Sequence, residues 1–409
     1  MNAHPNLINS LRALPRPAWI IFFGTFLNKF GTFVIPFLTL YLTSRGYSVA
    51  DAGFAVGAYG VGSLFASLLG GYLADKLGRR QTIMLSMFLG AAMMLLLSQA
   101  RSLPVIIGLT ALTGLASEFY RPASNALLAD LVPPEQRVTA FATLRMAFNA
   151  GFAFGPATAG LLAACGYFWL FAGDAVTSAL FGVVALVALP RVTPGGQTNA
   201  SWGEALTVLC RDRKLHQMLA ANLAIGVVFC QMASTFGLYM TQLGFSAASY
   251  GAVISLNGAL IVFCELPLTT ITRRFPMRRI MALGYVIIAA GFALNYFAHT
   301  LPALVGCMVL FTLGEMVTMP MASAYIANLA PAHLRGRYLG VSGLTWSLAL
   351  VFGPALGMKL LTLSPAIYFA ACGALGLLAA GIILIAVRPQ PVVTPGPLQK
   401  NLSSVRAAD

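Results

Sequence analysis

The chain has 409 residues, of which 58% are hydrophobic and only 9% are charged, whereas soluble domains carry about 25% charged residues. Its mean hydropathy is +0.82. This composition excludes a soluble protein and predicts an all-α membrane protein, because apolar segments recur from Trp19 to Val387 and each spanning helix needs about 20 apolar residues. The net charge of +14 does not indicate nucleic-acid binding, since the basic residues form short groups between apolar runs.

Apolar runs bounded by charges, prolines and glycines predict the membrane-spanning helices. We expect twelve of them, at residues 19–42, 50–71, 81–99, 104–128, 138–162, 166–189, 215–240, 248–270, 280–299, 302–325, 337–360 and 364–387. The first run is longer than a signal-peptide core and no small-residue cleavage site follows it, so we expect it to remain as the first helix.

The basic residues predict the orientation of these helices. With a cytoplasmic N-terminus, almost all loop arginines and lysines fall inside, and only Arg45, Arg101 and Lys359 fall outside. We therefore expect a multi-pass protein of the bacterial cytoplasmic (inner) membrane with both termini in the cytoplasm. The six cysteines are scattered without a CxxC pair or a nearby histidine, so the sequence predicts no metal site, no cofactor and no disulfide framework.

A polar break and an internal repeat divide the chain in two. We expect an N-terminal six-helix bundle at 1–190, a cytoplasmic linker at 191–214, a C-terminal six-helix bundle at 215–388 and a cytoplasmic tail at 389–409. One offset of 198 residues relates the halves. Residues that recur at this offset include Pro122, Arg137, Gly155 and Pro156, which match Pro320, Arg335, Gly353 and Pro354. Two parallel six-helix halves are typical of alternating-access transporters whose site lies between the halves at the bilayer midplane.

Three stretches resemble a known family. The loop after the second helix reads Gly71-Tyr-Leu-Ala-Asp75-Lys-Leu-Gly78-Arg79-Arg80, which resembles the G-x-L-a-D-r-x-G-R-[RK] signature of the major facilitator superfamily. The fifth helix contains Gly151-Phe-Ala-Phe-Gly155-Pro156-Ala-Thr-Ala159-Gly160, which is similar to the GxxxGPxxGG motif of the drug/proton antiporter branch, with Ala159 in place of one glycine. The tenth helix, with Gly314-Glu315, is similar to the acidic stretch of lactococcal-type multidrug/proton antiporters.

The resemblance implies a function and partners, although two further positions of this chain differ from the sequence pattern of the family. It implies a monomeric carrier that exchanges a small-molecule substrate for protons across the lipid bilayer. The branch usually has an arginine where this chain has Thr110, and the lactococcal type has a proton-linked aspartate where this chain has Arg145.

The signature loop predicts a conformational latch. Asp75 and Arg79 are four residues apart at a helix end, so their side chains can pair at the cytoplasmic surface. The resemblance adds Asp130 as a third member and implies that this loop, from Gly71 and Gly78 to Arg80, holds the halves together during one part of the cycle. The alternative is that its basic residues only retain the loop in the cytoplasm.

Glycines and prolines in the fifth and eleventh helices predict hinges or interfaces. Small residues allow close helix approach, and each proline removes a backbone donor. Helix packing alone is the alternative interpretation, and the 198-residue symmetry favours a shared hinge role. The residues concerned are Gly151, Gly155, Pro156, Gly353 and Pro354.

Four acidic residues lie within predicted spans and are candidates for proton coupling, namely Glu118, Asp174, Glu265 and Glu315. A buried charge costs about 2.5–3.5 kcal/mol on insertion scales, so such residues usually face a cavity or a partner. Glu315 lies near the middle of its helix without a base one turn away, which makes it the leading candidate for the proton carrier. A structural acid that is paired with a partner is the alternative.

The other three acids have nearby alternatives. Glu118 can pair with Arg121 three residues later, Glu265 can reach the basic loop at 273–279, and Asp174 can bond to Thr177 or Ser178.

Polar and basic residues within the spans complete the candidate substrate cavity. Lys29 and the adjacent Asn28 lie on a polar stripe of the first helix. Arg145 either faces the same cavity or pairs with Glu118. These residues favour a secondary transporter that exports amphipathic drug-like compounds in exchange for protons. The alternative is a proton-coupled carrier of an anionic or zwitterionic metabolite. We expect no enzyme activity, because GxSxG, HExxH and Walker A motifs are absent from the sequence.

Overall fold

The protein is almost entirely helical in the computed structural model, which describes residues 7–191 and 202–386. In the first half the helices are α1 (Leu7–Arg12), α2 (Arg16–Phe30), α3 (Val34–Ser44), α4 (Val49–Lys76), α5 (Arg79–Gln99), α6 (Leu103–Glu118), α7 (Tyr120–Leu131), α8 (Arg137–Cys165) and α9 (Phe168–Ala188). The remainder are α10 (Trp202–Arg211), α11 (Arg213–Ala233), α12 (Thr235–Gln242), α13 (Ala247–Thr272), α14 (Met277–Ala293), α15 (Leu301–Leu329), α16 (Arg335–Leu363) and α17 (Pro365–Ala386). Three short 3-10 helices join them: η1 (Pro134–Gln136), η2 (Leu294–Phe297) and η3 (Ala332–Leu334).

These helices form twelve spans in two pseudo-symmetric six-helix bundles. Ten stretches of the described chain are long and apolar enough to cross a membrane. The continuous α8 and the α2–α3 pair occupy the other two predicted positions. Large apolar side chains such as Leu161, Phe263 and Ile385 are exposed. In a bilayer such side chains face lipid, so the surface of the bundles suits hydrocarbon rather than water.

Three helices that the sequence predicts as continuous, at 19–42, 104–128 and 215–240, are interrupted, which corrects those ranges. The first breaks between α2 and α3, the fourth between α6 and α7 at Phe119, and the seventh between α11 and α12 at Ser234. At the first break, the Gly31 N–H still bonds to the Leu27 carbonyl, and the chain turns before α3 begins. The predicted polar linker also contains the helix α10. Linker residues 192–201 and the predicted tail at 389–409 lie outside the described residues.

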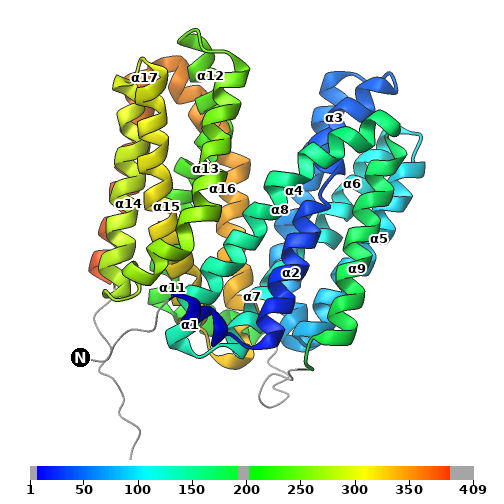
Figure 1. The fold of residues 1–409 in the computed structure, drawn as a ribbon, viewed down its shortest axis with the longest axis horizontal. Helices are drawn as coiled ribbons and strands as arrows, with labels where there is room; N and C mark the ends of the chain where they lie inside the picture. The colour runs from blue at the N-terminus through cyan, green and yellow to red at the C-terminus, as the bar shows by residue number, and fades with distance from the viewer. Residues whose placement is uncertain (1–6, 192–201, 387–409) are drawn as a thin grey trace, which may run out of the picture.

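The two bundles are in contact over one half of their length and separate toward the other end. Figure 1 shows their ribbons together near α1 and α7 and apart near α3 and α12. One apolar core runs through this joined end and contains Ala74 and Tyr120 of the first bundle with Leu334 and Tyr338 of the second. A separate core around Leu38, Leu97 and Phe171 fills the far end of the first bundle. The shared core therefore fixes the halves to each other at the end that the basic residues predict to be cytoplasmic.

The orientation of the bundles is tested by reporter fusions. We expect fusions after Arg45 and after Thr300 to report an external location, and fusions after Arg80 and after Gln197 an internal one, because the basic loops stay in the cytoplasm. A phosphatase and a fluorescent-protein reporter, which are active on opposite sides of the membrane, check each position. An external signal after Arg80 or Gln197 would reject this topology.

Candidate functional site

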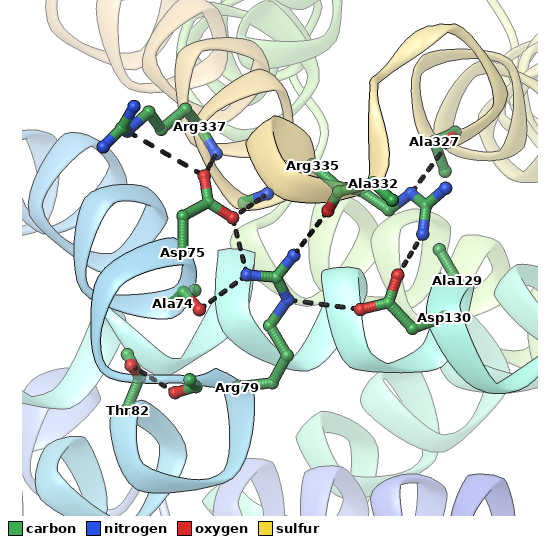
Figure 2. Close-up of polar contacts among 12 residues, drawn as sticks. Ala74, Asp75, Arg79, Thr82, Ala129, Asp130, Ala327, Ala332, Arg335 and Arg337 are labelled. Atoms are coloured by element: carbon green, nitrogen blue, oxygen red, sulfur yellow. Dashed lines mark hydrogen bonds and ion pairs between the residues drawn. The ribbon is translucent and has the colours of Figure 1, made fainter. Parts of the chain in front are cut away.

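A buried cluster of charges joins the two bundles at their predicted cytoplasmic ends (Figure 2). Arg79 begins α5 and its side chain is fully buried. Its Nη1 donates to Asp75 Oδ1 at 2.6 Å, and its Nε donates to Asp130 Oδ2 at 3.2 Å. Its Nη2 crosses to the other bundle and donates to the Ala332 carbonyl at 3.0 Å. One guanidinium therefore binds two carboxylates of its own bundle and a backbone oxygen of the other.

Asp75 extends this contact to the start of α16. Its two oxygens accept the backbone N–H groups of Gly336 at 3.0 Å and Arg337 at 2.9 Å. These N–H groups belong to the first turn of α16, where they have no acceptor within the helix and where the positive end of the helix dipole favours an anion. The ionised carboxylate thus stabilises a helix terminus of the opposite bundle.

Glycines allow this close approach of α4 and α16. A Cβ atom added at Gly71 would lie 2.6 Å from the Gly336 carbonyl oxygen, and one added at Gly336 would lie 2.6 Å from the Gly71 oxygen. Gly78 has φ of +102°, a conformation that side chains rarely adopt, and it turns the chain so that Arg79 follows Asp75 across the loop. A larger residue would therefore clash at Gly71 and would be strained at Gly78, which explains the two glycines of the signature.

A second pair of arginines repeats the internal symmetry. Arg335 donates to Asp130 of the other bundle and to the Ala327 carbonyl at 3.1 Å. Its counterpart Arg137 donates to Asn328 of the other bundle and to the Ala129 carbonyl at 3.1 Å. Asn328 is 198 residues after Asp130, so the two partners are related by the same offset as the two arginines. Arg335 of the second bundle therefore binds Asp130 of the first, and Arg137 of the first binds Asn328 of the second. We use the name latch cluster for Asp75, Arg79, Asp130 and Arg335.

Arg80 lies outside the latch cluster. Its side chain is bonded to the Leu186 carbonyl at the end of α9, within its own bundle. Of the signature residues, Gly71, Asp75, Gly78 and Arg79 contribute to the contact between bundles, and Arg80 fixes the loop to α9.

Farther from that end, one arginine of the first bundle binds two acids of the second. Arg145 of α8 donates from Nε to Glu265 Oε1 at 2.8 Å and from Nη2 to Glu315 Oε1 at 3.1 Å. Glu265 lies on α13 and Glu315 on α15, and both carboxylates are almost fully buried. We refer to these three residues as the acid–arginine triad.

The triad settles two alternatives that the sequence left open. Arg145 pairs with the acids of the other bundle and not with Glu118, and Glu265 binds Arg145 rather than the basic loop at 273–279. Glu315 has no base one turn away on its helix but receives Arg145 from α8. Buried charges are stable only with such partners, and the partners here come from a distant part of the chain.

Asn257 is a residue of this site that sequence reasoning missed. Its Nδ2 donates to Glu315 Oε2 at 2.8 Å and to Thr312 Oγ1 at 3.0 Å. It lies eight residues before Glu265 on α13, so both residues lie on the same side of the helix. This spacing in the sequence could have identified Asn257 as a site residue. Both Glu315 oxygens therefore accept hydrogen bonds. In contrast, Glu265 Oε2 is buried and has no hydrogen-bond partner among the described residues.

The first bundle holds a second charged group around Glu118. Lys29 Nζ donates to Glu118 Oε1 at 3.0 Å, the Tyr59 hydroxyl donates to the same oxygen at 3.2 Å, and Arg121 Nη1 donates to Oε2 at 3.3 Å. The predicted ion pair with Arg121 is present, but the closer partner is Lys29, and Tyr59 was not predicted. We refer to Lys29, Tyr59, Glu118 and Arg121 as the Glu118 cluster.

Two candidates, Asn28 and Asp174, are not bonded to the side chains of either charged group in the described structure, although Asp174 acts electrostatically on Lys29 and Tyr59. Asn28 is buried and its Nδ2 is 3.7 Å from the Met87 sulfur on α5, inside the first bundle. Asp174 is buried on α9 next to Ser178, and its carboxylate faces the backbone N–H groups of Phe33 and Val34 at the start of α3. An acid at a helix start is electrostatically favourable, so this contact accounts for Asp174 as a support of the broken first span.

The predicted hinge glycines lie at helix contacts within each bundle. A Cβ at Gly151 would lie 2.5 Å from the Phe26 carbonyl, and one at Gly155 would lie 2.7 Å from the Phe30 carbonyl, so α8 packs directly on α2. Gly353 approaches α11, where Gln231 Nε2 donates to its carbonyl at 2.8 Å. Pro354 and Pro156 follow within α16 and α8, and the Pro156 side chain lies outside the described residues.

Known proteins resemble this chain in sequence and in fold. A transporter of Bacillus subtilis that is called an uncharacterized MFS-type transporter, YqjV, is 30% identical over 83% of this chain and 85% of its own length. The multidrug resistance protein MdtH of Aeromonas hydrophila is 27% identical over 83% and 85%. A bacterial homologue of the iron transporter ferroportin, solved in an outward-facing state, superposes with a TM-score of 0.75 at 17% identity, and covers 91% of this chain and 99% of that one.

The family model of the Major Facilitator Superfamily matches residues 21–293 and 232–408, which together include nearly all of the described structure. The signature loop, the twelve spans in two bundles and this match agree. The chain therefore belongs to the major facilitator superfamily and is a multi-pass integral membrane transporter.

Proposed function

We propose that this transporter is a proton-coupled antiporter that exports amphipathic drug-like compounds by alternating access. The observation that carries the proposal is the acid–arginine triad, in which two buried carboxylates of one bundle share a single guanidinium of the other. The resemblance to multidrug resistance protein MdtH supports a drug-like substrate.

The triad has an imbalance of charge that one proton removes. Two ionised carboxylates and one guanidinium leave a net charge of −1 in a buried position, which is unfavourable unless a cation or a proton compensates it. Glu315 is fully bonded as a carboxylate, whereas one oxygen of Glu265 is buried without a partner in the described structure. The proton therefore belongs on Glu265, because its second oxygen receives no donor in the described structure and protonation there breaks no hydrogen bond.

The exchange follows from competition for this charge. Loss of the proton restores the net negative charge of the triad, which a positively charged group of a bound substrate must then balance. Because the three residues join α8 to α13 and α15, a change of protonation alters the free energy of contact between the bundles. The latch cluster holds the predicted cytoplasmic end closed, which corresponds to an outward-facing state.

Inside-out membrane vesicles with an acidic interior test the proposal. We expect the protein to concentrate amphipathic dyes inside the vesicles and to release protons as it does so, because export from the cytoplasm becomes uptake in this geometry. A protonophore should abolish the accumulation, and vesicles without the protein should show none. Uptake that persists unchanged after the pH gradient is collapsed would reject proton coupling.

A further inference from the structure

We propose that Arg121 forms a subsite for an anionic group, so that the preferred substrates are amphipathic compounds with a carboxylate beside an aromatic body. This inference deepens the proposed function and relies on it for the transport step. Binding of a substrate at the subsite does not depend on proton coupling.

The position of Arg121 places a cation within the membrane and not at its surface. It lies ten residues before Leu131, the end of the 29-residue span Leu103–Leu131, which corresponds to about 15 Å along the helix. Its neighbours Lys29, Tyr59 and Phe148 come from α2, α4 and α8. Since α4 and α8 also contact the second bundle, Arg121 lies on the side of the first bundle that faces the second.

The guanidinium of Arg121 has hydrogen-bond donors that bind no acceptor in the described part of the chain. Its side chain is 55% exposed, while Lys29 and Arg145 have 7% and 22% exposed. Its one hydrogen bond within the described part of the chain is the 3.3 Å contact of Nη1 with Glu118, so Nε and Nη2 are available. An intramembrane arginine with free donors is costly unless a ligand completes its hydrogen bonds.

The charge of the Glu118 cluster also favours an anion. One carboxylate faces two cations, Lys29 at 3.0 Å and Arg121 at 3.3 Å, and the nearby acid Asp174 acts electrostatically on Lys29. Lys29 is the closer partner and is nearly buried, so the uncompensated charge lies on Arg121. A carboxylate fits the planar guanidinium and can accept two parallel hydrogen bonds from it.

An aromatic surface adjoins this cation. The Phe148 ring lies 5.5 Å from the Arg121 guanidinium carbon and 5.2 Å from Lys29 Nζ. Phe152 stacks on Phe148 with an interplanar angle of 9° and a centroid separation of 6.4 Å. Arg145 of the acid–arginine triad is three residues before Phe148, so it lies one turn away on the same side of α8. A substrate with an aromatic body therefore fits between a positive group and a negative group.

Two dyes that differ in one group test the subsite. A rhodamine with a free benzoic acid and the methyl ester of the same rhodamine have almost the same shape, but only the acid carries a carboxylate. We expect the purified full-length protein to bind the acid more tightly than the ester. Arg121→Gln should reduce affinity for the acid by about tenfold or more, because charge-assisted hydrogen bonds are lost, and should leave affinity for the ester nearly unchanged.

Two further variants separate recognition from folding. Arg121→Lys keeps the charge but not the paired donors, so we expect intermediate affinity for the acid. Arg101→Gln removes an exposed arginine from a loop between helices and should bind both dyes as the parent does. Lys29 and Tyr59 still bind Glu118 in Arg121→Gln, so an unchanged melting temperature and unchanged ester binding should accompany the loss.

The outcomes distinguish this subsite from proton coupling. Equal affinity of the parent for the two dyes, failure of the parent to bind the acid, or equal losses for both dyes in Arg121→Gln would each overturn the subsite. These results require no pH gradient. If the acid binds through Arg121 but vesicles with an acidic interior do not accumulate it, the subsite stands and the proposed antiport fails.

Discussion

Glu265→Gln should abolish accumulation driven by a pH gradient while substrate still binds and still equilibrates across the membrane. Glutamine has the shape of protonated glutamate but cannot release a proton, and Arg145 keeps its bond to Glu315 in this variant. For each proton exchanged, one pH unit supports about a tenfold accumulation of a neutral substrate. The parent should approach this ratio in vesicles, and the variant should reach only the level of passive equilibration.

Glu315→Gln should lose coupling as well, for a related reason. It leaves one arginine and one carboxylate, Arg145 and Glu265, so the charge of the triad is already balanced and no proton is required. The sequence alone favoured Glu315 as the carrier, whereas we propose that the proton is held within the pair of acids that shares Arg145.

Other buried acids provide matched controls for this experiment. Glu118→Gln changes an acid that three side chains of its own bundle hold, and Asp174→Asn changes one on α9 that faces the start of α3. Both should retain accumulation of an uncharged dye, provided that the purified proteins remain monodisperse. Proton-driven accumulation in Glu265→Gln equal to that in the parent would remove the triad from the coupling mechanism.

The apolar runs predict the number and order of spans well, because length and hydropathy decide whether a segment can cross a bilayer. They do not predict the interruptions at Phe119 and Ser234, since an interrupted membrane helix keeps apolar side chains on both sides of the break. The internal symmetry also contains a signal for contacts between the bundles. It relates Arg137 to Arg335 and also relates Asn328 to Asp130, the two partners that these arginines bind.

The candidate site was predictable where its contacts are local. The pairs Asp75–Arg79 and Glu118–Arg121 are four and three residues apart and follow from helix geometry. In contrast, 120 residues separate Arg145 from Glu265, and 170 residues separate it from Glu315. Such pairs depend on how two bundles pack, and one sequence contains no spacing that reports it.

Asp75→Asn should shift the protein from the outward-facing toward the inward-facing state. The change removes a full charge from contacts with Arg79 and with two N–H groups at the start of α16, while the backbone of α4 and its glycine contacts remain. Hydrogen bonds to charged groups contribute about 1.5–3 kcal/mol each. Loss of even one such contribution changes the ratio of the two states by about tenfold or more.

Distances between spin labels at the outer ends of the bundles measure this shift. Labels at Ser44, the end of α3, and Thr241, near the end of α12, should be far apart in the parent and closer together in Asp75→Asn. Asp51→Asn is the matched control, because Asp51 is an acid in the first turn of the same helix, away from the second bundle. An identical distance distribution in parent and Asp75→Asn would show that this carboxylate does not hold the halves together.

A compensating change uses the internal symmetry of the latch. Arg137 already binds the side-chain oxygen of Asn328, so Asn328→Asp installs a carboxylate where the first bundle has Asp130 opposite Arg335. This second ion pair joins the same two bundles at the same end. Added to Asp75→Asn, it should therefore return the label distances toward those of the parent, and transport should recover with them. A loss of cross-bundle charge at Asp75 would then be offset by a gain at Asn328, the symmetry-related counterpart of Asp130, whereas a purely local role of Asp75 predicts no recovery.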